Sequence, residues 1–168
     1  MNKPFIRLNN KSQLENNILK ERIKHFNNSP IPQEEMLENL FMYIPKKDLA
    51  HLIFMIELYK KIIGSHGDIF EFGTRWGRNI SLFITLRGIF EPYNHTRKVV
   101  AFDTFSGFNK IQNEDGDHES LKIGAFSVSD NYFNYFSQLL EIKEKELPIN
   151  HIKKFHIMKG DVSKTTSS

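Results

Sequence analysis

The spacing of apolar residues along the chain changes character near residue 66. Before it, apolar positions recur at helical intervals and predict helices from Ser12 to the break at residue 27, over about 33–42 and over about 46–63. Ser12-Gln-Leu-Glu15 has the spacing of a capping box, which predicts the start of the first helix. The third helix carries apolar residues around most of its circumference, so we expect it to be buried on more than one side. These patterns predict an N-terminal helical segment over residues 1–65.

After residue 66, strand patterns and helix patterns alternate. Short apolar runs predict strands at residues 68–72, 97–103 and 155–158. Helical patterns predict connecting helices at about 78–89 and 129–145, with Ser129 as the N-cap of the second. This order predicts a parallel α/β half-sheet over residues 66–168. The long connection over about residues 104–128 is expected to form a mobile lid.

Composition and charge narrow the classes of function. The 23 Lys and Arg and 20 Asp and Glu give a net charge of +3, and the basic residues are scattered, so no nucleic-acid surface is expected. The absence of cysteine excludes disulfides, thiolate zinc sites and cysteine nucleophiles. The most apolar window, residues 49–63, carries charged residues, and the first ten residues contain no apolar core of a signal peptide. We therefore expect a soluble, cytoplasmic protein without membrane partners.

Metal binding is not expected either. Glu114, Asp115 and Asp117 form an acidic stretch, but they lack the full pattern of a calcium loop and are interpreted as a solvated loop. The histidines show no ligand spacing on a predicted helix.

The candidate chemistry stands directly after each predicted strand, because ligands of a parallel sheet bind at the carboxyl ends of its strands. The first strand leads into Glu71-Phe-Gly-Thr-Arg-Trp-Gly77, where the two glycines let the backbone turn tightly and approach a ligand. The second ends at Asp103, which is suited to accept hydrogen bonds from both hydroxyls of a ribose. The third leads into Gly160-Asp-Val162, where a carboxylate and an apolar residue could hold an adenine edge and face. Ordinary turn and cap chemistry explains each signal alone, and only their combination predicts a ligand crevice.

The glycine spacing separates two classes of cofactor. A dinucleotide fold places a pyrophosphate on a helix N-terminus through G-x-G-x-x-G. Here three residues separate Gly73 from Gly77, and two of them are the bulky Arg75 and Trp76. We therefore expect no binding of NAD.

Three segments together resemble the class I S-adenosylmethionine-dependent methyltransferases, and specifically the macrocin O-methyltransferase-like (TylF-like) group. Residues 71–77 look like that group's E-x-G-x-x-x-G motif, Phe102-Asp-Thr-Phe-Ser-Gly107 is similar to its D-S/T-F-x-G segment, and Gly160-Asp-Val162 stands where it has an adenine-contacting G-D. The resemblance covers about residues 67–162. It implies a Rossmann-like parallel sheet of the methyltransferase type, following the N-terminal helical segment. The family fold continues into a fourth strand, so the resemblance also implies a domain truncated after its third strand.

The resemblance further implies how S-adenosyl-L-methionine would be held. Glu71 and the backbone from Gly73 to Gly77 would hold the methionine part, Asp103 the ribose, and Asp161 with Val162 the adenine. Trp76 stands where many members have arginine, so Arg75 is expected to take over a contact to the cofactor's carboxylate. The full set of expected cofactor-binding residues is Glu71, Gly73, Thr74, Arg75, Gly77, Asp103, Thr104, Asp161 and Val162. No catalytic residue is identified, and a divalent metal is expected only in a longer form.

Two hypotheses of function remain. The first is methyl transfer to a hydroxyl of a sugar or small metabolite, carried out by an enzyme of which this chain is at least the cofactor-binding half. The second is a non-catalytic truncated remnant that binds at most an adenosine-type ligand or a partner chain. The expected partners are a small-molecule acceptor and further copies of the chain, which would associate through an exposed sheet edge. We expect the 168-residue chain to show no turnover.

Overall fold

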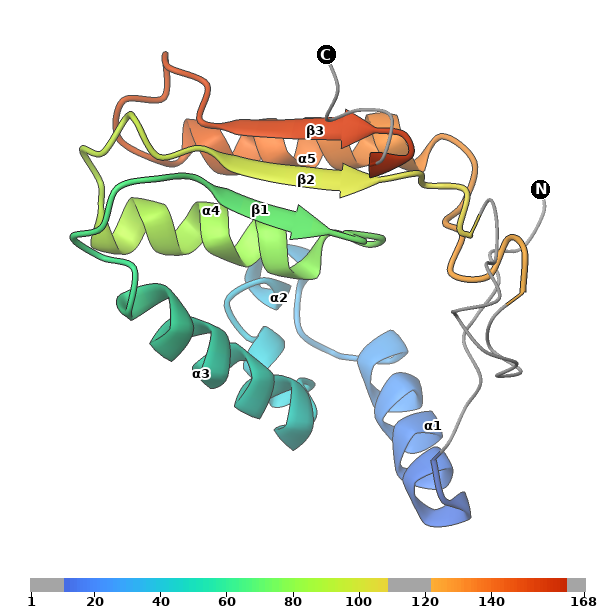
Figure 1. Cartoon of the computed structure of the whole chain (residues 1–168). Coiled ribbons are helices and arrows are strands. Elements are labelled where there is room, and N and C mark those ends of the chain that lie inside the picture. Colours follow the sequence, from blue (N-terminus) through green and yellow to red (C-terminus); the bar gives the residue numbers. More distant parts are fainter. Residues whose placement is uncertain (1–10, 109–121, 163–168) are drawn as a thin grey trace. The chain divides into compact units, whose positions relative to one another are not determined.

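The computed structural model describes residues 11–108 and 122–162, and these residues divide into two compact units, with the division between Met55 and Ile56. Figure 1 shows the elements in chain order. They are α1 (Gln13–Asn27), α2 (Gln33–Met36), the 3₁₀ helix η1 (Leu40–Met42), α3 (Lys46–Lys60), β1 (Ile69–Phe72), α4 (Arg78–Phe90), β2 (Val99–Asp103), α5 (Tyr132–Lys145) and β3 (Phe155–Lys159). In the described part of the chain, no helix combines the length and the apolar character needed to cross a membrane.

The N-terminal helices confirm one prediction and correct two others. The capping box of α1 is present, with the Glu15 N–H donating to Ser12 Oγ at 3.2 Å and the Ser12 N–H donating to Glu15 Oε2 at 2.8 Å. The single helix expected over residues 33–42 is wrong, because the chain forms the short α2 and then η1. Between them the Asn39 side chain bonds back to the Glu35 carbonyl at 3.0 Å, a local bond that competes with a continuous helix.

The expectation that the third helix is buried on more than one side is also wrong. Met55 and Tyr59 of α3 are buried, whereas Ile53, Phe54 and Leu58 are exposed. The helix ends at Lys60 rather than near residue 63, with tight turns over the residues that follow.

The sheet confirms the predicted parallel α/β architecture. Its order is β1-β2-β3, all pairs are parallel, and the register aligns Ile69 with Val99 and Val99 with Phe155. The central strand β2 is buried along its first four residues, as its apolar composition predicts.

Helices α4 and α5 cover one face of this sheet (Figure 1). They bury apolar side chains there, among them Ile80, Ile84, Phe136 and Leu140. Alternate strand residues point to opposite faces, so Phe70 and Phe72 lie on the other face, where they are 55% and 61% exposed. The Phe102 ring is buried between them, with centroids 5.9 and 5.0 Å away. The described residues therefore form a sheet with one face covered by helices and one face that presents aromatic rings.

The start of α5 differs from the prediction. Asn131, not Ser129, is the N-cap, and its φ of 63° lies in the left-handed region, which asparagine tolerates better than most residues. The Ser129 carbonyl instead accepts from the Tyr132 N–H at 3.1 Å, which forms a turn ahead of the helix.

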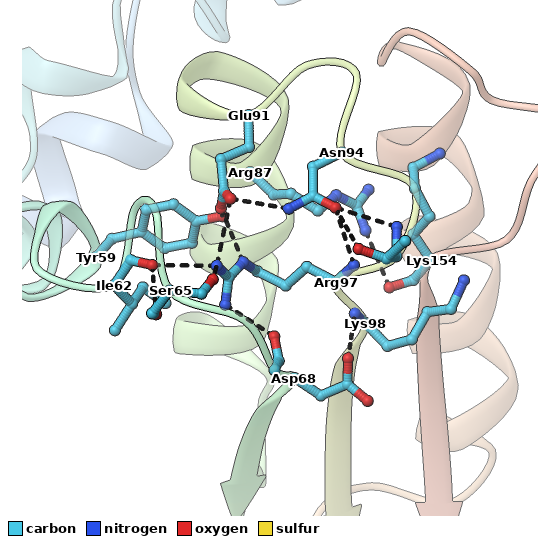
Figure 2. A network of polar contacts seen from close by, with 12 residues as sticks. Tyr59, Ile62, Ser65, Asp68, Arg87, Glu91, Asn94, Arg97, Lys98 and Lys154 are labelled. Carbon is cyan, nitrogen blue, oxygen red and sulfur yellow. Dashed lines mark hydrogen bonds and ion pairs between the residues drawn. The ribbon is translucent and has the colours of Figure 1, made fainter.

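A polar network closes the amino end of the sheet (Figure 2). The Arg97 guanidinium is buried and binds Glu91 at 2.9 Å, and it also donates to the backbone carbonyls of Ile62, Ser65 and Gly67. The Tyr59 hydroxyl donates to Glu91 at 2.7 Å. The Arg97 N–H donates to Asn94 Oδ1 at 3.2 Å and not to a neighbouring strand, and β2 begins at Val99 rather than at residue 97.

A second buried group of charges joins α4, α5 and the turn before β3. The Arg87 guanidinium donates to both oxygens of Glu144 and to the Lys154 carbonyl, and the Lys154 ammonium also pairs with Glu144. All three side chains are buried. This group therefore ties α4 and α5 to each other and to the start of β3.

Candidate functional site

The loop between β1 and α4 is tied to the end of β2. The N–H groups of Gly73 and Thr74 donate to the Phe102 carbonyl at 2.9 and 3.4 Å. Both Gly73 and Gly77 have positive φ, at 73° and 71°, which L side chains rarely adopt. The loop therefore turns sharply at both glycines, as the sequence predicts.

The two glycines have different surroundings. A Cβ atom on Gly73 would meet nothing within 4 Å, whereas one on Gly77 would lie 2.1 Å from the Phe136 ring. Gly77 thus allows α5 to pack against the loop, and Gly73 leaves open space at the end of the strand. Of the two, Gly73 is the position where a ligand can approach the backbone.

Glu71 connects β1 to the first turn of α4. Its Oε2 accepts from the Ile80 N–H at 2.9 Å and from Thr74 Oγ1 at 3.4 Å. A carboxylate in this place satisfies an N–H group at the helix start that has no partner within the helix. Burial raises the pKa of Glu71, although these hydrogen bonds act in the opposite direction, and the nearby Asp103 charge raises it further.

Asp103 holds the loops that follow two strands. Its Oδ2 accepts from the Arg75 N–H and its Oδ1 from the Phe105 N–H, both at 2.6 Å. A carboxylate oxygen accepts two hydrogen bonds, so each oxygen keeps capacity for one more donor. The two adjacent hydroxyls of a ribose are two such donors. The side chain is therefore suited to the predicted role of accepting hydrogen bonds from a ribose.

The end of β3 lies beside the end of β2. The Gly160 N–H donates to the Asp103 carbonyl at 3.0 Å, and Lys159 pairs with Asp103 in the register. Asp161, which is half-buried, and Val162, which is 40% exposed, follow directly. The ends of all three strands are thus neighbours, and the sequence-predicted residues after each strand come together at one edge.

Strained backbone gathers at this edge. Five non-glycine residues in the described ranges have positive φ, and four of them lie in loops here: Arg75, Phe105, Phe126 and Asn131. Such conformations cost on the order of 1–3 kcal/mol each and cluster at functional sites. Arg75 and Phe105, whose N–H groups donate to Asp103, are among them, so the carboxylate stabilises a strained arrangement.

The connection after β2 is fixed at both described ends. The Phe108 N–H donates to the Ala125 carbonyl at 3.1 Å, and the Gly124 N–H donates back to Phe108 at 2.9 Å. The residue after Ala125 is Phe126, whose ring centroid lies 5.2 Å from the Arg75 guanidinium carbon. The same guanidinium carbon also lies over the Trp76 ring. The acidic stretch Glu114–Asp117 lies outside the described residues, and the lid stays a prediction.

A cavity of about 610 Å³ lies at the same edge. It is lined by residues 104–106, residues 127–134 and Lys159. Thr104, one of the predicted residues, lines it and donates its hydroxyl to the Gly107 carbonyl at 2.8 Å. The wall formed by residues 127–134 was not predicted from the sequence. Four of the five residues from Ser127 to Asn131, directly before a helix, are polar, and this is the signal that could have found it.

Two solved structures are similar to this chain. A crystal structure of CalS11, a calicheamicin methyltransferase, has a TM-score of 0.89 and 33% identity over 95% of this chain. An apo structure of CalS11, described as a TDP-rhamnose 3′-O-methyltransferase in calicheamicin biosynthesis, has a TM-score of 0.77 and 29% identity over 96% of this chain. The fold is of the methyltransferase type. The chain spans 62% and 60% of the lengths of those two chains.

Comparison by sequence alone adds no further relative. No protein-family model matches the chain, and no curated protein matches its sequence. The likeness to CalS11 therefore carries the comparison.

Proposed function

We propose that this chain binds S-adenosyl-L-methionine at the carboxyl edge of the β1-β2-β3 sheet and serves a methyltransferase that modifies a sugar hydroxyl. The observation that carries the proposal is Asp103, whose two oxygens organise the loops after β1 and β2 and keep capacity for two further donors. The likeness to a TDP-rhamnose 3′-O-methyltransferase supports the choice of a sugar as acceptor. The E-x-G-x-x-x-G motif supports a place in the TylF-like group.

The residues at this edge fit such a cofactor. Gly73 leaves open space where the methionine part would pass the backbone, and Asp103 would accept from the ribose hydroxyls. Asp161 and Val162 would hold the adenine edge and face. The Arg75 guanidinium, half-buried between two aromatic rings, would pair with the carboxylate of the cofactor.

When bound, S-adenosylmethionine supplies a methyl group that is activated by the positive charge of the sulfonium. The chain's own contribution is then orientation and exclusion of water. Asp103 would hold the ribose, and Glu71 holds the loop at the start of α4. We assign no catalytic base to the described residues.

The alternatives are NAD as the ligand and a non-catalytic truncated remnant that binds at most an adenosine-type ligand or a partner chain. The spacing of Gly73 and Gly77 and the packing of Phe136 against Gly77 leave no cradle for a pyrophosphate at that turn. The strain gathered at the carboxyl edge favours a ligand site there. Turnover of S-adenosylmethionine would separate an enzyme from a non-catalytic remnant.

Calorimetry tests the proposal directly. The purified chain is titrated with S-adenosylhomocysteine and, separately, with NAD. We expect S-adenosylhomocysteine to bind and NAD to bind more weakly or not at all. Tighter binding of NAD, or no binding of S-adenosylhomocysteine, would overturn the proposed function.

A further inference from the structure

Tyr132, at the start of α5, reaches across to the loop between β1 and α4. Its hydroxyl donates to the Trp76 carbonyl at 2.9 Å, and its ring meets the Trp76 ring edge to face at 4.7 Å. The same ring is nearly parallel to that of the fully buried Phe136, with an interplanar angle of 11°. Ring packing therefore holds the Tyr132 side chain in place, and its hydroxyl hydrogen-bonds to the loop between β1 and α4.

The hydrogen bond from Tyr132 is made to Trp76, the loop residue that follows the three residues bonded to β2. β2 and Asp103 accept hydrogen bonds from the N–H groups of Gly73, Thr74 and Arg75. Trp76 is held from the opposite side, by α5. The loop is thus clamped between a carboxylate and a phenol that come from different elements.

The bond sets the orientation of one peptide unit. The Trp76 carbonyl and the Gly77 N–H belong to the same planar peptide, so fixing one fixes the other. That N–H donates to the Thr74 carbonyl at 2.9 Å and closes the turn that leads into α4. Without the hydroxyl, the peptide between Trp76 and Gly77 would lose its anchor on α5.

We propose that Tyr132 is a positioning residue for the cofactor loop, whose hydroxyl holds the Trp76–Gly77 peptide in the orientation that binds ligand. This inference rests on the function proposed above. Tyr132 also lines the cavity at the carboxyl edge, as does Thr104, one of the residues predicted to bind the cofactor. A tyrosine hydroxyl is protonated and able to donate at neutral pH, and burial raises the pKa of Tyr132 further.

Two matched variants isolate the hydroxyl. Tyr132→Phe removes one oxygen and keeps the ring that packs on Trp76 and Phe136. Tyr135→Phe removes the same oxygen from a tyrosine three residues along the same helix, whose side chain is 61% exposed. Any general effect of losing a phenol from α5 appears in both variants, and only the loss of the Trp76 contact appears in Tyr132→Phe alone.

Trp76 is the single tryptophan of the chain, so its fluorescence reports on this loop without labelling. We expect Tyr132→Phe to lower the anisotropy of Trp76 in the free protein and to weaken binding of S-adenosylhomocysteine by about three- to tenfold, the effect of one neutral hydrogen bond. Saturating ligand should restore the anisotropy to the wild-type value, which a general loss of packing would not do. Tyr135→Phe should match wild type in both measurements.

The outcomes separate this inference from the function on which it rests. If wild type does not bind S-adenosylhomocysteine in calorimetry, the proposed function fails, and the role of Tyr132 in binding fails with it. If wild type binds and Tyr132→Phe binds equally well, only the role of Tyr132 is overturned. The same holds if Tyr135→Phe loses as much affinity as Tyr132→Phe.

Discussion

The two ends of the sheet use their polar groups differently. At the amino end, Arg97 is 4% exposed and its donors reach a carboxylate and three backbone carbonyls within the protein (Figure 2). At the carboxyl end, Asp103 binds one N–H group with each oxygen, and Gly73 faces open space. Internal partners account for the polar groups of the amino end, whereas the carboxyl end keeps capacity for a ligand. The polar groups of the amino end stabilise the fold, and the carboxyl end is where we propose that a ligand binds.

Two glutamates show the same contrast in their pKa values. Burial alone would raise the pKa of Glu91 at the amino end, but hydrogen bonds from Tyr59, Asn94 and Arg97 outweigh burial and lower it. Burial raises the pKa of Glu71 at the carboxyl end, and its hydrogen bonds do not compensate. Ionised Glu91 therefore stabilises the fold, and ionised Glu71 is held at a cost.

The largest expected effect comes from breaking a buried charge group. Glu144→Ala would leave Arg87 and Lys154 buried without their carboxylate, which costs about 3–5 kcal/mol of the free energy of unfolding. Glu141→Ala, on the same helix, removes an exposed carboxylate 3.9 Å from Lys153 and should cost about 0–1 kcal/mol. Urea denaturation of both variants measures the difference. Equal costs would mean that the buried group does not stabilise the fold.

The next effect concerns ligand binding at the opposite end. Asp103→Ala should weaken binding of S-adenosylhomocysteine by about 1.5–3 kcal/mol, because hydrogen bonds to a charged group are lost. Asp68→Ala is the matched control, since Asp68 accepts from the Lys98 N–H at the amino end of the same sheet. Calorimetry with the folded variants should show a loss for Asp103→Ala only. Unchanged binding in Asp103→Ala would place the ribose elsewhere.

The two glycines of the β1–α4 loop offer a smaller contrast. Both alanine variants carry the strain of a positive φ, but only Gly77→Ala forces a Cβ atom into the Phe136 ring. Gly77→Ala should therefore cost about 1–3 kcal/mol more of the free energy of unfolding than Gly73→Ala, the usual cost of overpacking. Thermal unfolding of the pair tests this difference. A larger loss of stability in Gly73→Ala would contradict the open space assigned to that position.

The pH dependence of stability is the smallest expected effect. The pKa of Glu71 in the folded protein is raised above 4.5, its ordinary value. The stability that this shift contributes is therefore fully present below pH 4.5, and it is lost as the pH rises through the folded pKa. The pKa of Glu91 is lowered below 4.5, so its contribution is present above that value and is lost as the pH falls through the folded pKa. The difference in the free energy of unfolding between Glu71→Gln and wild type should thus change with pH above pH 4.5. For Glu91→Gln the same difference should change with pH below pH 4.5. Denaturation from pH 7 to pH 3 checks this, and differences in the same window for both variants would contradict it.

The sequence alone determined the features that depend on near neighbours along the chain. The capping box at Ser12, the strands around residues 69–72 and 155–159, and the parallel order of the sheet follow from local spacing and apolar periodicity. The candidate residues after each strand were likewise identified, because the carboxyl ends of parallel strands meet at one edge.

Only the tertiary structure decided which partner each of these residues meets. It distinguished Gly73 from Gly77 through the position of Phe136, and it brought the Tyr132 hydroxyl to Trp76, which is 56 residues away in sequence. It also gave Glu144 two buried cations that no local pattern connects. Such contacts depend on how α5 packs against α4 and the sheet, and packing is a property of the whole core that residue spacing does not encode.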